Sequence, residues 1–78
     1  MQILVSQTAM ALYKEFFNEI FPTEQIVDEL KDFFMEESNT RLRRIKYNAD
    51  TGCYLYVQKN IDGDMVIIGA EKQEEDNE

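Results

Sequence analysis

The chain has 78 residues with a formal net charge of −8, and 44% of its side chains are hydrophobic and 12% aromatic. This length allows one domain with one small core, which stabilises a fold by only about 3–5 kcal/mol without a disulfide, a metal or a partner. Histidine is absent. Because histidine is the commonest general base and metal ligand at neutral pH, Ser/His/Asp and Cys/His catalytic arrangements are excluded.

Other sequence features argue against secretion, membrane insertion and cofactor chemistry. The single cysteine, Cys53, has no partner for an intramolecular disulfide, which is typical of a reducing compartment, so we expect a cytoplasmic protein. The start of the chain lacks the basic segment of a signal peptide, and no stretch reaches the roughly 18 apolar residues of a membrane span. The three glycines form no phosphate-binding loop. Asp62 and Asp64 lie in a turn and lack the further ligands of a calcium loop. We therefore expect no enzymatic activity, no cofactor and no metal.

The apolar spacing of residues 9–21 predicts a first helix that begins near Ser6 or Thr8 and turns one stripe to a core. An alternative for the preceding residues is a short strand from Gln2 to Val5 at an edge of the sheet. The stripe consists of Ala9, Leu12, Tyr13, Phe16, Phe17 and Ile20.

A second helix is predicted to begin at Thr23, because Pro22 disfavours a helical conformation at the preceding residue and threonine is a good N-cap. The helix should end before Ser38 and Asn39. The short link predicts that the two helices are neighbours. The apolar positions of this second helix are Ile26, Val27, Leu30, Phe33 and Phe34.

From Arg41 the pattern changes to β-branched and aromatic residues, with turns at NADTG and NIDGD, so three strands are expected. Asp62-Gly63 predicts a two-residue type I′ turn, and the other turn predicts a left-handed glycine at Gly52. The predicted fold is α+β, with two N-terminal helices packed on a three-stranded antiparallel meander (α-α-β-β-β). Residues 1–70 would form the domain, and residues 71–78 a disordered acidic tail.

Charge is distributed unevenly along the chain. Residues 1–40 hold eight acids and two bases, residues 41–60 one acid and five bases, and residues 61–78 seven acids and one base. Helical spacing gathers acids of the second helix into a surface that we call the acidic ridge, which could contact a basic partner. The alternative is a solvated face that only maintains solubility. The acidic ridge consists of Glu24, Asp28, Glu29, Asp32 and Glu36.

The bases gather on the first predicted strand, and they could contact phosphates or guard an edge of the sheet while pairing with the second helix. The total charge of −8 would repel a polyanion, so direct nucleic-acid binding is not expected. The basic residues in question are Arg41, Arg43, Arg44 and Lys46.

A second candidate surface follows from the two-residue turn, which places tyrosines and aliphatic side chains on one face of the sheet. Two helices can cover only the opposite face, so this face would meet a partner, a second copy or water. The residues expected on it are Ile45, Tyr47, Tyr54, Tyr56, Met65 and Ile67.

These observations lead to two hypotheses of function. The first is a non-enzymatic protein-binding module, such as a small acidic inhibitor of phage or mobile-element type, that presents carboxylates to a basic, nucleic-acid-binding surface of its target. The second is a homodimeric structural or regulatory subunit that associates through the tyrosine face. Sequence patterns determine neither the partner nor the oligomeric state.

Overall fold

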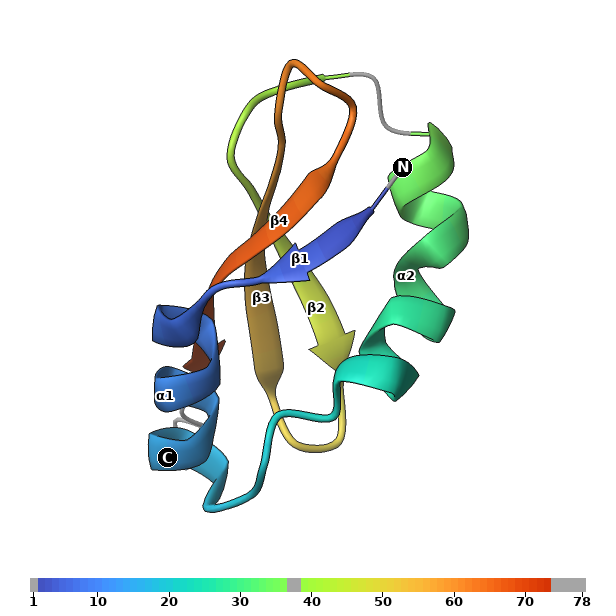
Figure 1. The fold of residues 1–78 in the computed structure, drawn as a ribbon. Helices are drawn as coiled ribbons and strands as arrows, with labels where there is room; N and C mark the ends of the chain where they lie inside the picture. Colours follow the sequence, from blue (N-terminus) through green and yellow to red (C-terminus); the bar gives the residue numbers. More distant parts are fainter. Residues whose placement is uncertain (1, 37–38, 74–78) are drawn as a thin grey trace.

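The computed structural model describes residues 2–36 and 39–73 of the chain. The helices are α1 (Gln7–Phe17) and α2 (Thr23–Glu36), and the strands are β1 (Ile3–Val5), β2 (Arg43–Asn48), β3 (Cys53–Lys59) and β4 (Met65–Lys72). They form an α+β fold with one four-stranded sheet in the order β1-β4-β3-β2 (Figure 1). The α+β class is confirmed, but the three-stranded meander is wrong because β1 adds a fourth strand. The alternative of a strand within residues 2–5 is confirmed.

β1 lies parallel to β4 at one edge of the sheet, with Leu4 opposite Val66. Ser6 then joins this strand to the first helix. Its amide donates to the carbonyl of Ile67 at 3.0 Å, and its hydroxyl donates to the carbonyl of Ile68 at 2.9 Å. The same hydroxyl oxygen accepts from the amide of Ala9 at 3.0 Å, which is the N-cap bond of α1. One serine therefore sets both the end of β1 and the start of α1.

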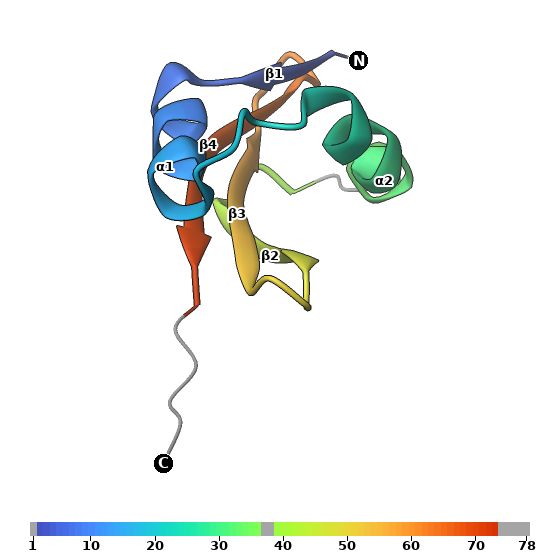
Figure 2. The same cartoon turned by 90° about the horizontal axis from the view of Figure 1, so that it is seen from below.

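The two helices do not pack side by side, so that prediction is wrong. α1 lies against β4, and α2 lies apart from it, with strands between them in the view of Figure 2. α1 ends at Asn18 in the left-handed conformation (φ 55°). The buried ring of Phe21 then contacts the ring of Tyr13 edge-on at 5.3 Å. The link is thus held extended by its own buried aromatic residue, which keeps the helices apart.

The core lies on one face of the sheet, between the strands and the helices. Ile26 and Phe34 of α2 are fully buried, and Tyr13 of α1 is nearly so. Full burial of a large apolar side chain stabilises the folded state by about 1.5–3 kcal/mol. Ile26 and Phe34 therefore hold α2 on the sheet. The strands supply the remaining half of the core, namely Cys53, Leu55, Val57, Met65, Ile67 and Ala70.

The turn between β3 and β4 is longer than predicted. The amide of Asn60 donates to the carbonyl of Asp64 at 2.8 Å, and the amide of Gly63 donates to the carbonyl of Asn60 at 3.1 Å. The side-chain oxygen of Asn60 also accepts from the amides of Asp62 and Asp64, at 3.0 and 2.9 Å. Gly63 has a positive φ of 91°. The prediction of a two-residue turn at Asp62-Gly63 is therefore wrong, because the hydrogen bonds of Asn60 with Asp62, Gly63 and Asp64 close a larger loop.

A β-bulge in β4 changes which residues face the core. Val57 pairs with Ile67, whereas Leu55 pairs with Ala70, so β4 contributes one more residue than β3 between these pairs. Met65 and Ile67 consequently lie on the core side, with 1% and 0% of their surface exposed. The prediction that these two residues share a face with the tyrosines of β3 is wrong.

A second irregularity lies in β2. Ile45 pairs with Leu55 and Asn48 with Cys53, so Tyr47 is the additional residue between these pairs. Ile45 and Tyr47 both pack against the core. Their predicted place on the same face as Tyr54 and Tyr56 is therefore wrong as well, and for the same reason, since one extra residue exchanges the two faces of a strand.

The sheet extends past the predicted end of the domain, because β4 includes Glu71 and Lys72. The amide of Gln73 donates to the carbonyl of Gly52 at 2.8 Å. Residues 71–73 thus belong to the folded part and not to a tail. Residues 74–78 of the predicted tail lie outside the described residues.

We predict that Gly52→Ala destabilises the fold more than Gly63→Ala does. Both glycines have positive φ, at 72° and 91°, which costs about 1 kcal/mol or more for a residue with a Cβ. At Gly52 the added Cβ would also lie 3.0 Å from the carbonyl oxygen of Gln73, whereas at Gly63 it meets nothing within 4 Å. Urea unfolding followed by circular dichroism measures both. An equal loss of stability in the two variants would contradict the steric part of this prediction.

Candidate protein-binding surfaces

The acidic ridge lies on the solvent side of α2. Its apolar stripe, which includes Ile26 and Phe34, packs on the sheet. A helix with 3.6 residues per turn then brings Glu24, Asp28 and Asp32 close to one line on its surface. Every acid of the predicted set is exposed: Glu24, Asp28, Glu29, Asp32 and Glu36.

Among the residues that the structure describes, no ion pair involves the acidic ridge. Glu29 differs from the other acids because it lies near Tyr47 of β2. The pKa of the Tyr47 hydroxyl is raised, chiefly by burial and then by the negative charge of Glu29. Around the helix axis Glu36 lies about 20° and Asp32 about 60° from Glu29, whereas Asp28 lies about 100° from it. The ridge is therefore a continuous band across the solvent side of α2, and Glu29 and Glu36 form its edge toward β2.

The face of the sheet opposite the core, which we call the outer face, is covered by no helix among the described residues except at Gly69, where Leu12 of α1 lies close. It is formed by the side chains that alternate with the buried ones. Of the predicted interface residues, only Tyr54 and Tyr56 lie on it, both half-buried. The outer face consists of Leu4, Arg44, Lys46, Tyr54, Tyr56, Gln58, Val66, Ile68 and Glu71.

Charged and aromatic groups form a network at one end of the outer face. The guanidinium of Arg44 lies 3.9 Å from the ring centre of Tyr54 and 2.9 Å from a carboxylate oxygen of Glu71. The hydroxyl of Tyr56 donates to that same oxygen at 3.0 Å. The basic strand β2 is an edge strand, as expected. Its Arg44, however, pairs with β4 and not with the second helix.

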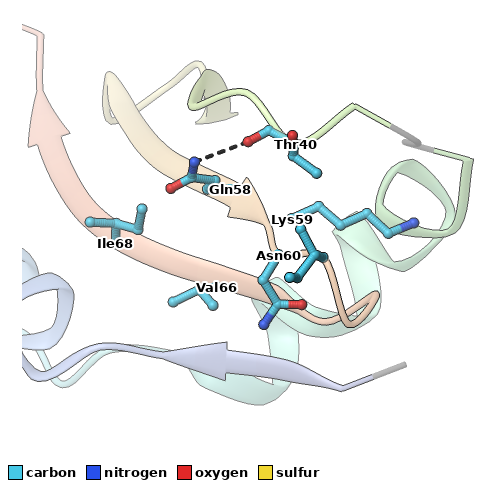
Figure 3. A pocket seen from close by; sticks show the side chains of 7 residues that line it. Thr40, Gln58, Lys59, Asn60, Val66 and Ile68 are labelled. Atoms are coloured by element: carbon cyan, nitrogen blue, oxygen red, sulfur yellow. Dashed lines mark hydrogen bonds between the residues drawn. The ribbon is translucent and has the colours of Figure 1, made fainter.

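The other end of the outer face is hollowed, and both apolar and polar residues line the hollow (Figure 3). A hollow of about 490 Å³ lies over Val66 and Ile68. The side-chain amide of Gln58 donates to the carbonyl of Thr40 at 3.0 Å across its rim. Leu4, opposite Val66, extends the apolar part of this surface onto β1 and is 45% exposed.

A further groove lies where α2 passes the free edge of β1. We call it the edge groove, and its volume is about 430 Å³. The sequence reasoning missed it because Ile3 of β1 and the α2 residues are far apart in the chain. Met35 is 63% exposed, but a single exposed apolar side chain on a helix is common and gave no signal by itself. The groove is lined by Ile3, Val27, Lys31 and Met35.

The described residues include no group of three or more acids, cysteines or histidines that could hold a metal. None of their helices has the length and apolar character needed to cross a membrane. Cys53 is buried and free, and burial raises the pKa of its thiol from 9.0 to about 11. A thiol in this state is a poor nucleophile at neutral pH.

Comparisons of the chain with protein families, with curated proteins and with solved structures found no match. Three surfaces of the described residues are therefore the candidates for its function. These are the acidic ridge, the outer face and the edge groove.

We predict that Cys53 reacts with Ellman's reagent at pH 8 at least about 100-fold more slowly in the folded chain than in guanidinium chloride. A pKa of about 11 in place of 9.0 lowers the thiolate fraction by about that factor, and burial adds a steric barrier. The raised pKa also means that the fold binds this proton more tightly. The contribution of Cys53 to stability is complete below pH 9 and is lost as the pH rises toward 11. Rapid labelling of the folded chain at pH 8 would contradict the buried position.

Proposed function

We propose that this chain is a non-enzymatic protein-binding module that presents the carboxylates of α2 to a basic surface of another protein. The observation that carries the proposal is the exposure of the whole acidic ridge on one rigid helix, without an ion pair to any other described residue. Because Ile26 and Phe34 anchor the helix in the core, the backbone that carries these carboxylates is held in place. Association then costs less backbone freedom than it would for an unfolded acidic segment.

The regular spacing of the acids favours a partner whose basic groups are also regularly spaced. Successive acids four residues apart on a helix lie roughly 6 Å apart along its axis. The phosphates of a nucleic-acid strand are likewise a regularly spaced row of negative charges. A basic surface that binds phosphates could therefore accept Glu24, Asp28 and Asp32 in their place. In this form the chain would act as an inhibitor that competes with nucleic acid for its target.

The proposal predicts that Asp28→Asn/Asp32→Asn weakens binding to a short oligo-arginine peptide by roughly 5- to 30-fold. Each exposed ion pair contributes up to about 1 kcal/mol, and two such pairs give this change in Kd. The matched control is Glu15→Gln/Glu19→Gln, which removes the same two charges from exposed positions of α1 and the adjacent link.

Fluorescence anisotropy at low and high salt measures these affinities. Binding of the unaltered chain should weaken steeply with salt, because ions are released on association. Equal losses in the ridge variant and the control would show that only the net charge matters, and would contradict a specific role for α2.

A second candidate function is a homodimer that associates through the outer face. An isologous dimer brings one surface against itself, so that surface must be self-complementary. The outer face meets this condition because Arg44 and Glu71 already neutralise each other at one end, while Leu4, Val66 and Ile68 provide apolar surface toward the other end. The acidic ridge does not, because it would repel its own copy. Tyrosine and arginine are also the residues most enriched at the centres of interfaces.

The homodimer predicts a mass above 9.2 kDa in sedimentation equilibrium at micromolar concentration. It should persist at high salt, because apolar contacts are not screened. Ile68→Glu should return the chain to a monomer. Ile20→Glu, at an exposed position in the link between the helices, should leave the dimer intact. A mass that stays monomeric at every concentration would eliminate this candidate.

A further inference from the structure

We propose that the edge groove binds an extended, apolar and basic segment of the partner, which adds to the sheet as a fifth strand beside β1. This inference rests on the proposed function, because it names the part of the partner that the chain recognises. The features that support it are the outer edge of β1, which pairs with no other described residue, the groove under α2 and the acids that border the groove.

The sheet has two outer edges, and only one of them carries charge. β2 forms one edge and bears Arg43, Arg44 and Lys46, which are the residues that proteins use to prevent strand addition. β1 forms the other edge and consists only of Ile3–Val5. An uncharged, aliphatic edge strand is an open template for a further strand.

The backbone of β1 has hydrogen-bonding groups directed away from β4. The carbonyl of Gln2 accepts from Met65 at 2.9 Å, and the amide of Ser6 donates to Ile67 at 3.0 Å. In a parallel pair alternate residues bond to the same neighbour, so Gln2, Leu4 and Ser6 face β4. The amide and carbonyl groups of Ile3 and Val5 therefore face the open edge.

The edge groove lies beside these groups and has the length of a short strand. Figure 1 shows the start of β1 beside the C-terminal half of α2. From Val27 to Met35 the helix advances roughly 12 Å, at 1.5 Å per residue. An extended segment covers that distance with about four residues. A strand added beside β1 would turn every second side chain into the groove, against Val27, Met35 and Ile3.

Charge complementarity identifies the partner segment as basic. At 100° per residue Glu24 and Asp28 lie about 60° and about 100° from Val27 around the helix, on the flank that faces away from β2, whereas Asp32 lies about 140° from it. Lys31 itself lines the groove, so this flank carries two acids and one base, a net charge of −1. A lysine or arginine entering the groove can place its stem on Val27 and its charge near Glu24, which lies one turn earlier on the helix. The expected segment thus alternates aliphatic and basic residues.

Amide hydrogen exchange with a blocked, alternating valine–lysine peptide tests this proposal. The amides of Ile3 and Val5 should become protected when the peptide is added, because they gain partners in the new strand. Met35→Gln should lower the affinity for the peptide at least about threefold. Met10→Gln, at an exposed position on α1, should leave the affinity unchanged. A peptide methylated at alternate backbone nitrogens should lose most of its binding, because it cannot donate to the edge.

The outcomes separate this inference from the proposed function. Suppose that Asp28→Asn/Asp32→Asn lowers the affinity for the peptide but that the methylated peptide binds as tightly as the unmethylated one. The acidic ridge then acts without strand addition, and the inference is overturned. If the amides of β2 become protected instead of those of β1, the inference is also overturned. If Ile3 and Val5 become protected but the ridge variant binds equally well, the edge is the site and the electrostatic function is overturned.

Discussion

The pairing of β1 with β4 is the constraint on which the rest of the structure depends. This short parallel ladder ends at Ser6, whose hydroxyl also caps α1, so the helix must begin at the edge of β4. α1 then lies along the part of β4 that β1 does not reach. In the link that follows, the ring of Phe21 packs against Tyr13 of α1. α2 then buries Ile26 and Phe34 in the part of the core away from α1. Because Ile3–Val5 pair with β4, the open edge on this side of the sheet belongs to β1 and not to β4.

Helix positions could be predicted from the sequence, because apolar residues at helical spacing and strong breakers such as Pro22 act locally. The face of the sheet on which each strand residue lies could not be predicted, because in β2 and in β4 it depends on a single extra residue. The bulge in β4 lies near Gly69, and a glycine inside a strand is a known sign of a bulge that the reasoning did not use. The bulge at Tyr47 has no such local sign, since tertiary packing alone draws that ring to the core.

The candidate surfaces show the same division between local and tertiary information. The acidic ridge follows from helical spacing alone, so its five exposed residues were predicted together. Glu71 was assigned to an acidic tail on composition, and only the sheet brings it to Arg44. The edge groove joins Ile3 to Met35, which are more than thirty positions apart in the numbering. No pattern within one segment could indicate that contact. The result is a molecule whose opposite sides differ, with carboxylates on α2 and arginine, lysine and tyrosine on the outer face.

The position of Gln2 has a practical consequence for any segment attached to the start of the chain. Its amide is held by the carboxylate of Asp64 at 3.0 Å, so a preceding segment would leave the fold beside the edge groove. A tethered segment experiences an effective concentration in the millimolar range. An apolar or basic affinity tag placed there would occupy the groove in its own molecule and hide it from other ligands. Labels attached after Gln73, where the chain is bonded to Gly52, would leave the groove accessible.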